Sequence, residues 1–443
     1  EKLKQIDDER IPQEKTCAAK FNSAALSPAD LVSLAEVYGD VGDATRSAEL
    51  MGAVRKHPKV TKVDVANVLA LQINNGLRET KSDARNARLE TIVDELDALG
   101  PEAFEQQWNA HARMNGYYRG DDIDAGIIKH STWIINAGAA CKPEDRLRLA
   151  PTVASAHVNM AEAWAGQGMT AKALALLDDG VKAWGAISPR PNAASLKEMY
   201  FDEEIARLKL VGTKGAPLTA PTWFNGPAGG SLDLAGKVTL LEFTAHWCGP
   251  CRESYPGVNR LRAKYGPQGF QVVLATRLWG YFESERNLAA DAELAKDKTY
   301  FAHHELSDVP VAIGPLVSVK VVDGKVVYEP HKDINDEAYR VGGIPQIMLV
   351  DKKGTIRLIM VGYDDANEPK LAKMIEDLSQ SQEGRITLRR DHNDNLILRV
   401  STLPTPHGER IAIRILREHV SGFTLESLGF HGAGLEKVHE SLR

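Results

Sequence analysis

A pair of cysteines between an apolar segment and a helical segment constrains this chain more than any other feature. The apolar run VTLLEFTA (238–245) is followed by HWCGPC, in which Cys248 and Cys251 bracket Gly249 and Pro250. A pair with this spacing holds a metal or carries redox chemistry more often than it makes a structural bridge. The fold must therefore bring the end of a strand and the start of a helix together at these two sulfurs.

A zinc site is the first interpretation to test. Tetrahedral zinc needs four ligands, yet Cys17 and Cys141 are isolated, and the adjacent His303 and His304 lack the usual spacing of paired histidine ligands. We therefore expect no metal and no bound cofactor, and we interpret both histidines as surface residues. Cys17 and Cys141 could form a disulfide only if the helical domain brought their Cα atoms within about 7 Å of each other. We expect both to be buried free thiols instead.

The same residues favour redox chemistry. A helix beginning near Cys248 would place that thiol at a helix N-terminus, where unpaired backbone N–H groups and the helix dipole favour the thiolate. We expect Cys248 to be the exposed nucleophile. Cys251 lies one turn further along, close enough to attack a mixed disulfide at Cys248. Gly249 and Pro250 would stiffen the turn that holds the two thiols together.

Length and composition limit the other possibilities. A chain of 443 residues is too long for one core, so two to four domains are expected. Its net charge is −6, with acidic and basic residues interspersed, which predicts neither a nucleic-acid partner nor binding to an anionic membrane. No apolar run approaches the roughly 18 to 20 residues of a membrane span. Since the chain starts at Glu1 rather than Met, a membrane anchor could lie only upstream of residue 1.

The N-terminal part, residues 1–212, is predicted to be helical. Apolar residues recur at helical spacing from about 25 to 210, and SPAD (27–30) is typical of a helix start. The stretches 31–58 and 157–184 align on Gly42 and Gly168. Small residues, an aromatic residue and the turn glycine then coincide, which resembles the tetratricopeptide repeat. We expect helical hairpins that bind a protein partner, or a plain helical bundle without a ligand.

From residue 213 the pattern changes to strands alternating with helices. Strands are predicted at 238–245 and 270–278 with a helix between them, then hairpins at 317–329 and 345–361 and a helix at about 367–380. After residue 382 the chain alternates apolar and charged residues, which predicts a small β unit, and SGFTLESLGF (421–430) is predicted to begin a short helical end.

Five sequence motifs occur here in the same order as in one known protein family. WCGPC after an apolar strand, Pro256 in the following helix and GGIPQ before another strand resemble thioredoxin. With APTW (220–223) and LDLAGKVTLLEF ahead of the cysteines, residues 216–381 are similar to the exported TlpA/ResA-type thiol-disulfide oxidoreductases. We therefore expect a multidomain protein with an all-α helical-hairpin domain (1–212), an α/β thioredoxin-like domain (213–381) and a small C-terminal α+β fragment (382–443).

The resemblance implies roles for further residues. Pro345 matches the cis-proline beside the active site, and Ile344 and Pro345 would expose backbone to the substrate strand. Trp247 matches the aromatic residue that shields the thiol, unless it serves only packing. Glu242 matches the buried acid that takes the proton of the resolving thiol, unless it lies on a solvated strand face. Burial would raise the pKa of this carboxyl.

Two departures from the family pattern and one rival family bear on this interpretation. His246 stands where Thr or Glu is commoner, and we interpret it as a surface residue. About 283–335 contains an insertion whose helix and aromatic residues could form a substrate lid or a packing surface. Peroxiredoxins have Thr or Ser three residues before their cysteine, but Ala245 stands here, so disulfide exchange is favoured over peroxidase chemistry.

The tail resembles a different family. RVSTLPTPHGERIAIRIL, beginning at Arg399, is similar to the segment before the phosphate loop in type II secretion and type IV pilus (GspE/PilB-like) ATPases. The resemblance implies Arg399 and Arg410 as vestigial nucleotide-binding candidates. The nearest match to a phosphate loop, at 230–238, has the wrong spacing, which argues against ATP hydrolysis. The tail could be a docking module, a truncated ATPase or a gene-fusion scar.

These observations predict a thiol-disulfide oxidoreductase that reduces protein disulfides. Its partners would be a protein disulfide substrate and a thiol electron donor. The resemblance implies a periplasmic or exported, possibly membrane-anchored protein, or a cytoplasmic one if the tail is a functional module. The alternative is a scaffold that uses the helical repeats and the tail to bind secretion or pilus components.

Overall fold

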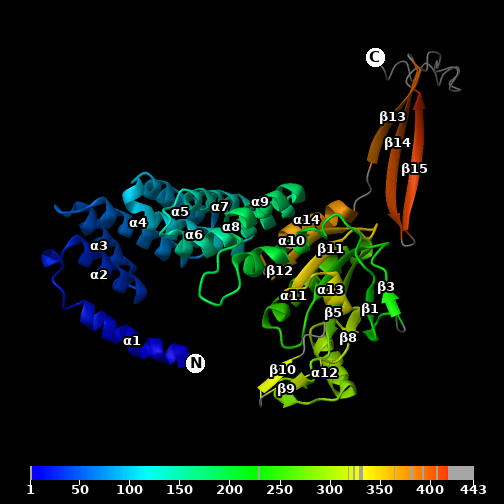
Figure 1. The fold of residues 1–443 in the computed structure, drawn as a ribbon, viewed down its shortest axis with the longest axis horizontal. Coiled ribbons are helices and arrows are strands. Elements are labelled where there is room, and N and C mark those ends of the chain that lie inside the picture. Colours follow the sequence, from blue (N-terminus) through cyan, green and yellow to red (C-terminus); the bar gives the residue numbers. More distant parts are fainter. Residues whose placement is uncertain are drawn as a thin grey trace, which may run out of the picture. The chain divides into compact units, whose positions relative to one another are not determined.

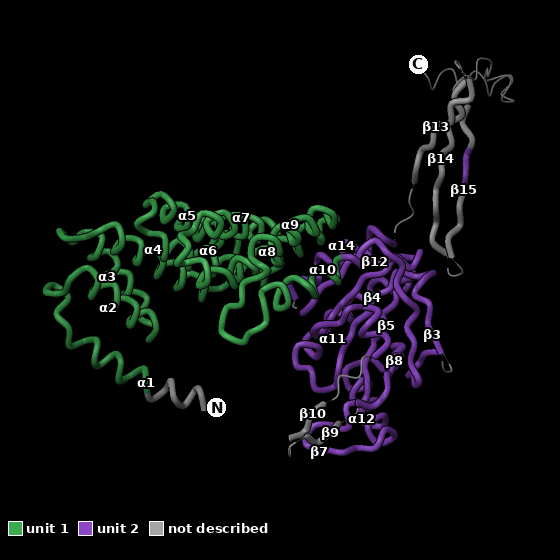
Figure 2. The backbone as a smooth tube through the Cα atoms, in the orientation of Figure 1, with its two compact units in different colours: residues 1–208 green, residues 209–443 purple. Residues whose placement is uncertain are grey.

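The computed structural model describes residues 2–227, 230–317, 319–322, 325–328, 333–363, 365–379, 383–391, 394–405 and 408–417 (Figure 1). Two compact units divide the chain, Glu1–Leu208 and Lys209–Arg443 (Figure 2).

The first unit consists of helices with short connections. Its elements are α1 (Lys2–Ala18), η1 (Ser23–Ala25), α2 (Pro28–Asp40), α3 (Ala44–Lys56), α4 (Lys62–Leu77), α5 (Asp83–Asp97), η2 (Pro101–Ala103), α6 (Phe104–Gly120), α7 (Asp124–Ala139), α8 (Arg146–Gly166), α9 (Thr170–Trp184), η3 (Lys197–Phe201) and α10 (Asp202–Leu208). The helical prediction for this region is confirmed. Among the helices of the described residues, none combines the length and the apolar character that a membrane span requires.

Side chains at the helix starts determine where these helices begin. Ser27 caps α2: its hydroxyl accepts the N–H of Asp30, and the Asp30 carboxylate accepts the N–H of Ser27 in return. Thr61 and Asp64 form the same capping box at α4. These reciprocal bonds satisfy backbone N–H groups that a helix leaves without intrahelical partners. The predicted helix start at SPAD is therefore confirmed.

The two aligned stretches form helical hairpins with the same turn. Gly42 and Gly168 follow α2 and α8 with φ of 78° and 79°, a left-handed conformation that glycine adopts without strain. The next N–H donates to the carbonyl of the aligned aromatic residue, Tyr38 or Trp164, at 2.8 Å in each hairpin. The hairpins are confirmed, while the tetratricopeptide resemblance stays a prediction.

A network of polar side-chain contacts joins α5, α6 and α7. His130 Nε2 lies 3.0 Å from Glu90 Oε1, and the Nδ1 atoms of His130 and His111 are 2.9 Å apart. His111 Nε2 lies 3.2 Å from the Asp97 carboxylate. Both imidazoles are buried, so these contacts replace hydration that burial removes. Sequence spacing did not predict this polar network, because its members come from three helices.

The second unit is built on a six-stranded mixed sheet. Its strands follow the order β12-β11-β4-β5-β8-β2, in which β4 pairs parallel with β5 and antiparallel with β11. The strands of this sheet are β2 (Thr222–Phe224), β4 (Val238–Phe243), β5 (Phe270–Arg277), β8 (Val311–Gly314), β11 (Gln346–Val350) and β12 (Ile356–Val361). The predicted strands at 238–245 and 270–278 therefore lie side by side at the centre.

Helices and short hairpins complete this unit. They are β1 (Leu218–Ala220), β3 (Gly230–Leu232), α11 (Gly249–Tyr265), η4 (Gly266–Gln268), β6 (Tyr281–Phe282), β7 (Glu285–Arg286), α12 (Ala290–His303), β9 (Val319–Val322), β10 (Lys325–Tyr328), α13 (Ile334–Ala338) and α14 (Glu368–Ser379). The predicted hairpins and the helix at 367–380 are confirmed. The insertion contributes α12, which buries Phe301 in the core and so serves packing.

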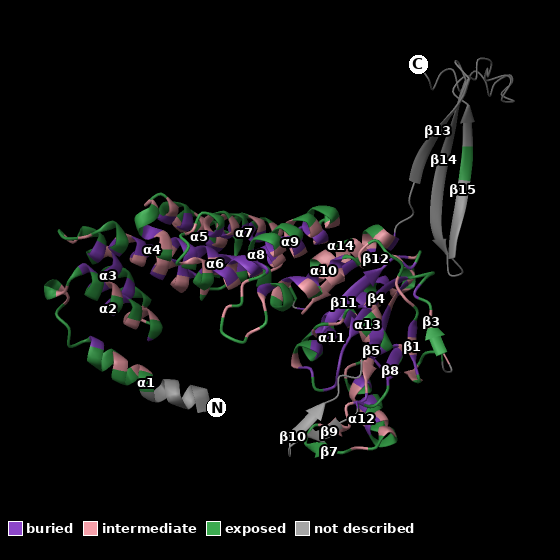
Figure 3. Cartoon of the chain, in the orientation of Figure 1, coloured by how far each residue is buried: buried purple, intermediate pink, exposed green. Residues whose placement is uncertain are grey.

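Alternate side chains of β4 enter two apolar cores, one on each face of the sheet. Val238 and Leu240 pack with residues of α11 and α14, including Val258 and Ile375. The intervening Leu241 and Phe243 pack on the other face, in a core that also holds residues of β1 and α13. All six residues of β4 are buried (Figure 3).

The C-terminal part contains a separate three-stranded antiparallel sheet. It consists of β13 (Glu383–Asp391), β14 (Asp394–Thr405) and β15 (Gly408–Arg417) in sequence order. The predicted β unit is confirmed, and the helical end predicted at 421–430 lies outside the described residues.

The remaining cysteines correct one expectation. Both Cys17 and Cys141 are free, but Cys17 is exposed and Cys141 is half-buried. The expectation of buried thiols is wrong because Cys17 lies near the end of α1, and Cys141 lies just after the end of α7, rather than on a core-facing position.

Because Glu90 belongs to the polar network, we expect the stability of the first unit to be sensitive to a Glu90→Gln substitution. Burial alone would raise the pKa of Glu90, but hydrogen bonds from His130, Lys129 and Tyr118 outweigh it and lower the pKa to about 2. Glu90 therefore stabilises the fold above its unfolded pKa of 4.5, and this contribution is lost as the pH falls towards 2. We expect E90Q to lower the free energy of unfolding by about 1 to 3 kcal/mol at pH 7.

Thermal unfolding of the full chain, followed by far-ultraviolet circular dichroism between pH 3 and 7, measures this effect. The difference between E90Q and wild type should shrink below pH 4.5. Glu95→Gln is the matched control, since Glu95 on the same helix forms an exposed ion pair with Arg55. Equal effects of the two substitutions would contradict the assigned role of Glu90.

Candidate redox site

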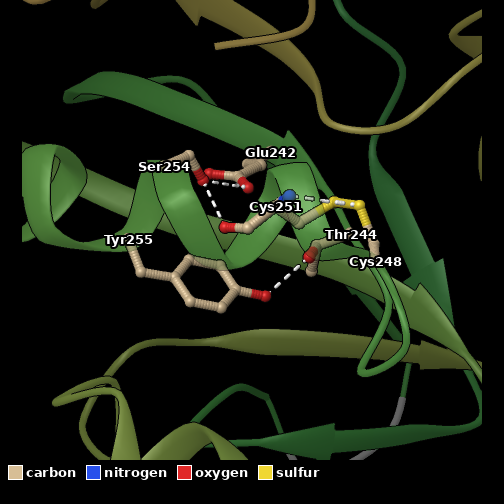
Figure 4. Close-up of a disulfide and its surroundings, with 6 residues drawn as sticks. All are labelled: Glu242, Thr244, Cys248, Cys251, Ser254 and Tyr255. Carbon is tan, nitrogen blue, oxygen red and sulfur yellow. Dashed lines mark hydrogen bonds between the residues drawn. A yellow bond between two sulfur atoms is a disulfide. The ribbon is translucent and has the colours of Figure 1, made fainter. Parts of the chain in front are cut away.

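The two cysteines meet at the first turn of α11. Cys248 is the N-cap of this helix, and its sulfur accepts the backbone N–H of Cys251 at 3.2 Å. A disulfide joins Cys248 to Cys251 (Figure 4). An N–H group directed at the Cys248 sulfur would stabilise a thiolate there once the disulfide is reduced.

One sequence expectation about Cys248 is wrong in this oxidised form. The residue is only 3% exposed, although we expected an exposed nucleophile. Its sulfur is bonded to Cys251, which is fully buried, and both residues belong to the apolar core beneath α11. The helix N-terminus is placed as predicted, but the disulfide keeps the sulfur inside.

Glu242 lies behind the disulfide in the central strand. It is fully buried, opposite Leu274 of β5 and Ile347 of β11. Burial raises the pKa of Glu242 to about 8, although a hydrogen bond from Ser254 partly opposes the shift. The solvated strand face that the sequence left open is therefore excluded, and this carboxyl can exchange a proton near neutral pH.

Ser254 connects Glu242 to Cys251, and sequence reasoning missed it. Its Oγ atom lies 2.8 Å from Glu242 Oε1 and 2.7 Å from the carbonyl oxygen of Cys251 (Figure 4). The Ser254 hydroxyl is the donor in both contacts, so its single hydrogen is shared between a carboxyl oxygen of Glu242 and the backbone carbonyl of Cys251. The signal was its position three residues after Cys251, on the same face of α11.

A second hydroxyl pair lies beside the cysteines. Thr244 Oγ1 and the hydroxyl of Tyr255 are 2.7 Å apart, and both residues are buried. Burial raises the pKa of Tyr255 well above its ordinary value, so this phenol stays protonated. The pair supplies a hydrogen bond and no exchangeable charge near neutral pH.

The remaining predicted binding residues flank Cys248 in sequence or directly precede β11. The Ile344–Pro345 peptide bond is cis, as predicted. Pro345 is buried and directly precedes β11, the strand that pairs with β4. Trp247 is 42% exposed, Gly249 is half-buried and Pro250 is exposed. Their roles in substrate binding stay predictions.

His246 is not the surface residue that the sequence indicated. Its side chain is 3% exposed, and its ring stacks on Phe282 with centroids 4.8 Å apart. Nε2 lies 3.7 Å from Glu293 Oε1 of α12. The expectation was wrong because β6 and the insertion helix α12 pack against this histidine, and neither is near it in sequence.

Other predicted residues lie apart from the disulfide or remain on the surface. His303 is exposed as expected, while His304 is half-buried against Tyr300. Arg399 lies in β14, opposite Arg414 of β15, and Arg410 lies opposite Leu403. That three-stranded sheet contains none of the redox-site residues. Within the described part of the chain, no group of three or more His, Cys, Asp or Glu side chains could hold a metal ion.

Comparison with known proteins finds two separate similarities. The thiol-disulfide oxidoreductase ResA of Bacillus cereus is 27% identical over 130 residues, covering 29% of this chain and 58% of that protein. The family described as Type II/IV secretion system protein matches residues 372–443. The type IV pilus assembly ATPase PilB of Pseudomonas aeruginosa is 27% identical over 139 residues, covering 29% of this chain and 23% of that protein.

These similarities confirm both resemblances predicted from the sequence, to the TlpA/ResA-type oxidoreductases and, in the C-terminal fragment, to the secretion ATPases. The chain spans less than two thirds of the length of either relative. A crystal structure of a thiol:disulfide interchange protein DsbE from Chlorobium tepidum is 26% identical, with a TM-score of 0.28, covering 38% of this chain and 98% of that one.

The raised pKa of Glu242 predicts a specific dependence of stability on pH. Between its ordinary pKa of 4.5 and about 8, the folded state holds a proton that the unfolded state has released. Stability therefore falls as the pH rises through this window, by at most about 1.4 kcal/mol per pH unit. Glu242→Gln removes this decline. The free energy of unfolding of E242Q relative to that of wild type should therefore rise with pH up to about pH 8.

Urea unfolding of the oxidised protein at several pH values between 4.5 and 9 measures this difference. Glu253→Gln is the matched control, because Glu253 is exposed on α11. If E242Q and wild type showed parallel pH profiles, Glu242 would be ionised in the fold and the assignment would fail.

Proposed function

We propose that this chain is a thiol-disulfide oxidoreductase that reduces protein disulfides through Cys248 and Cys251. The observation that carries the proposal is the Cys248–Cys251 disulfide at the first turn of α11, where the Cys248 sulfur accepts a backbone N–H. The similarity to ResA supports the same reaction class.

The first step is attack on the substrate. The Cys248 thiolate forms a bond to one sulfur of the substrate disulfide, and the other substrate sulfur leaves as a thiolate. A mixed disulfide between Cys248 and the substrate results. Reduction removes the bond to Cys251, so the Cys248 sulfur is free to turn outward for this attack.

The second step releases the substrate. Cys251 loses its proton, and its thiolate attacks the Cys248 sulfur of the mixed disulfide. The second substrate sulfur leaves as a thiolate, and the Cys248–Cys251 disulfide forms, so that two electrons pass to the substrate. The ionised form of Glu242 accepts the proton of Cys251. Because burial raises the pKa of Glu242 to about 8, a minor fraction of this carboxyl is ionised at pH 7, and that fraction is a stronger base than an ordinary carboxylate.

The direction and setting of the reaction follow from the family resemblance. Gly249-Pro250 and Ile344-Pro345 are more similar to reducing thioredoxins, so we assign reduction of a protein disulfide, with re-reduction by a thiol donor. The TlpA/ResA resemblance favours a periplasmic or exported location. A cytoplasmic location would follow if the C-terminal fragment is a functional module.

A scaffold is the second candidate, and the C-terminal similarity favours it. Residues 372–443 match the Type II/IV secretion system family. In this alternative, the helical hairpins and the tail recruit protein partners, and the thioredoxin-like domain binds without exchanging electrons.

Replacement of Cys251 by Ser separates the two candidates. In a C17S/C141S background, which removes the free thiols, C251S should accumulate mixed disulfides on Cys248, because the resolving thiol is absent. Non-reducing electrophoresis and mass spectrometry detect them, and the C248S/C251S variant is the control. The enzymatic proposal fails if no adduct forms and the C17S/C141S protein with its intact dithiol reduces no insulin disulfide.

Glu242→Gln tests the proton acceptor. Loss of general base catalysis should slow release of the mixed disulfide by about 100-fold at pH 7, while the first attack by Cys248 is much less affected. Rapid chemical quench separates the two rates, and Glu253→Gln again serves as the control. Equal rates of release in E242Q and wild type would remove Glu242 from the mechanism.

A further inference from the structure

The insertion helix α12 holds a loop next to the redox site through a buried carboxylate. Glu293 is fully buried, and its two oxygens accept the backbone N–H groups of Trp279 and Gly280, each at 2.7 Å. A buried polar group is stable only with such hydrogen-bond partners. Nothing in the proposed electron transfer uses Glu293, so its contacts point to a different task.

The loop that Glu293 holds places a second tryptophan against Trp247. The rings of Trp279 and Trp247 meet edge to face with centroids 5.0 Å apart. Trp247 directly precedes Cys248 and is 42% exposed. The Arg277 guanidinium lies 4.5 Å from the Trp279 ring centroid and covers one face of that ring.

A neighbouring loop extends this apolar surface. Leu316 is 40% exposed, and a Cβ atom added to Gly280 would lie 3.6 Å from Leu316 Cδ1. The N–H of Val317 donates to the carbonyl of Leu278 at 2.8 Å, which ties the two loops together. Trp247, Trp279 and Leu316 form what we call the aromatic wall.

We propose that the aromatic wall is a recognition surface for an apolar side chain adjacent to the substrate cysteine, and that Glu293 is its positioning residue. The proposal rests on the proposed disulfide exchange at Cys248. A mixed disulfide at Cys248 necessarily brings the neighbours of the substrate cysteine over Trp247. The occupant is therefore a substrate segment with an aromatic or large aliphatic residue beside its cysteine.

The charge beside the wall sharpens this specificity. Arg277 occupies a face of Trp279 and pairs with Asp336 at 3.4 Å. A lysine beside the substrate cysteine would approach this cation without burying apolar surface. We therefore expect kcat/KM to decrease in the order Phe, Gly, Lys for the residue that precedes the substrate cysteine.

Three matched peptide disulfides test the proposal on the reduced full-length protein. They are symmetric dimers that differ only in having Phe, Gly or Lys before the cysteine, and release of peptide thiol is followed by chromatography. 2-Hydroxyethyl disulfide measures the thiol chemistry alone. We expect kcat/KM to favour Phe over Gly by about tenfold, chiefly through KM, because the aromatic side chain is buried on binding.

Variants separate the wall from the chemistry. Each rate is divided by that variant's own rate with 2-hydroxyethyl disulfide. Leu316→Ser and Glu293→Gln should bring the ratio of Phe to Gly towards one, since the first removes wall surface and the second releases the loop. Leu316 is exposed, so L316S keeps the test valid if E293Q folds poorly. Leu147→Ser, at an exposed leucine of the first unit, should retain the wild-type ratio.

The outcomes distinguish two failures. If the wild-type protein reacts with 2-hydroxyethyl disulfide but reduces all three peptides equally, the wall is not a recognition surface. The same conclusion follows if L316S keeps the full preference for Phe. If the reduced protein reacts with no disulfide at all, the proposed function itself fails.

Discussion

The position of strand β4 at the centre of the sheet is the constraint on which the redox site depends. Hydrogen bonds to β5 on one side and β11 on the other fix its register, and all its side chains are buried. Glu242 must therefore point into an apolar core, and the chain leaving Phe243 must turn directly into α11. One strand thus positions both Glu242, the proposed proton acceptor, and the turn that carries the two cysteines.

The two cysteines lie in different electrostatic environments. Cys248 caps a helix N-terminus, where an N–H group and the dipole stabilise negative charge. Cys251 lies beneath it in the core, linked through Ser254 to a carboxyl whose burial raises its pKa to about 8. The asymmetry suits a nucleophile that must be ionised and a partner that must keep its proton until it attacks.

Polar side chains that are buried or half-buried hold separate elements together in both units. Glu293 is stable inside because two backbone N–H groups satisfy it, and the loop that supplies them becomes fixed in turn. In the first unit, Glu90 and Asp97 flank the buried pair His130 and His111, which connects three helices. In both units, hydrogen bonds to carboxylates thus join elements that are distant in sequence.

The sequence by itself determined the local structure: SPAD started α2, the turn glycines Gly42 and Gly168 followed the ends of α2 and α8, and the apolar runs formed the central strands, with Cys248 at the start of α11. These features depend on neighbours within a few residues. Only the tertiary structure decided that Cys248 and His246 are buried, that Ser254 bridges to Glu242, and that Glu293 holds Trp279 against Trp247. Burial and hydrogen bonding depend on segments such as α12 that pack from far along the chain, and periodicity carries no record of that packing.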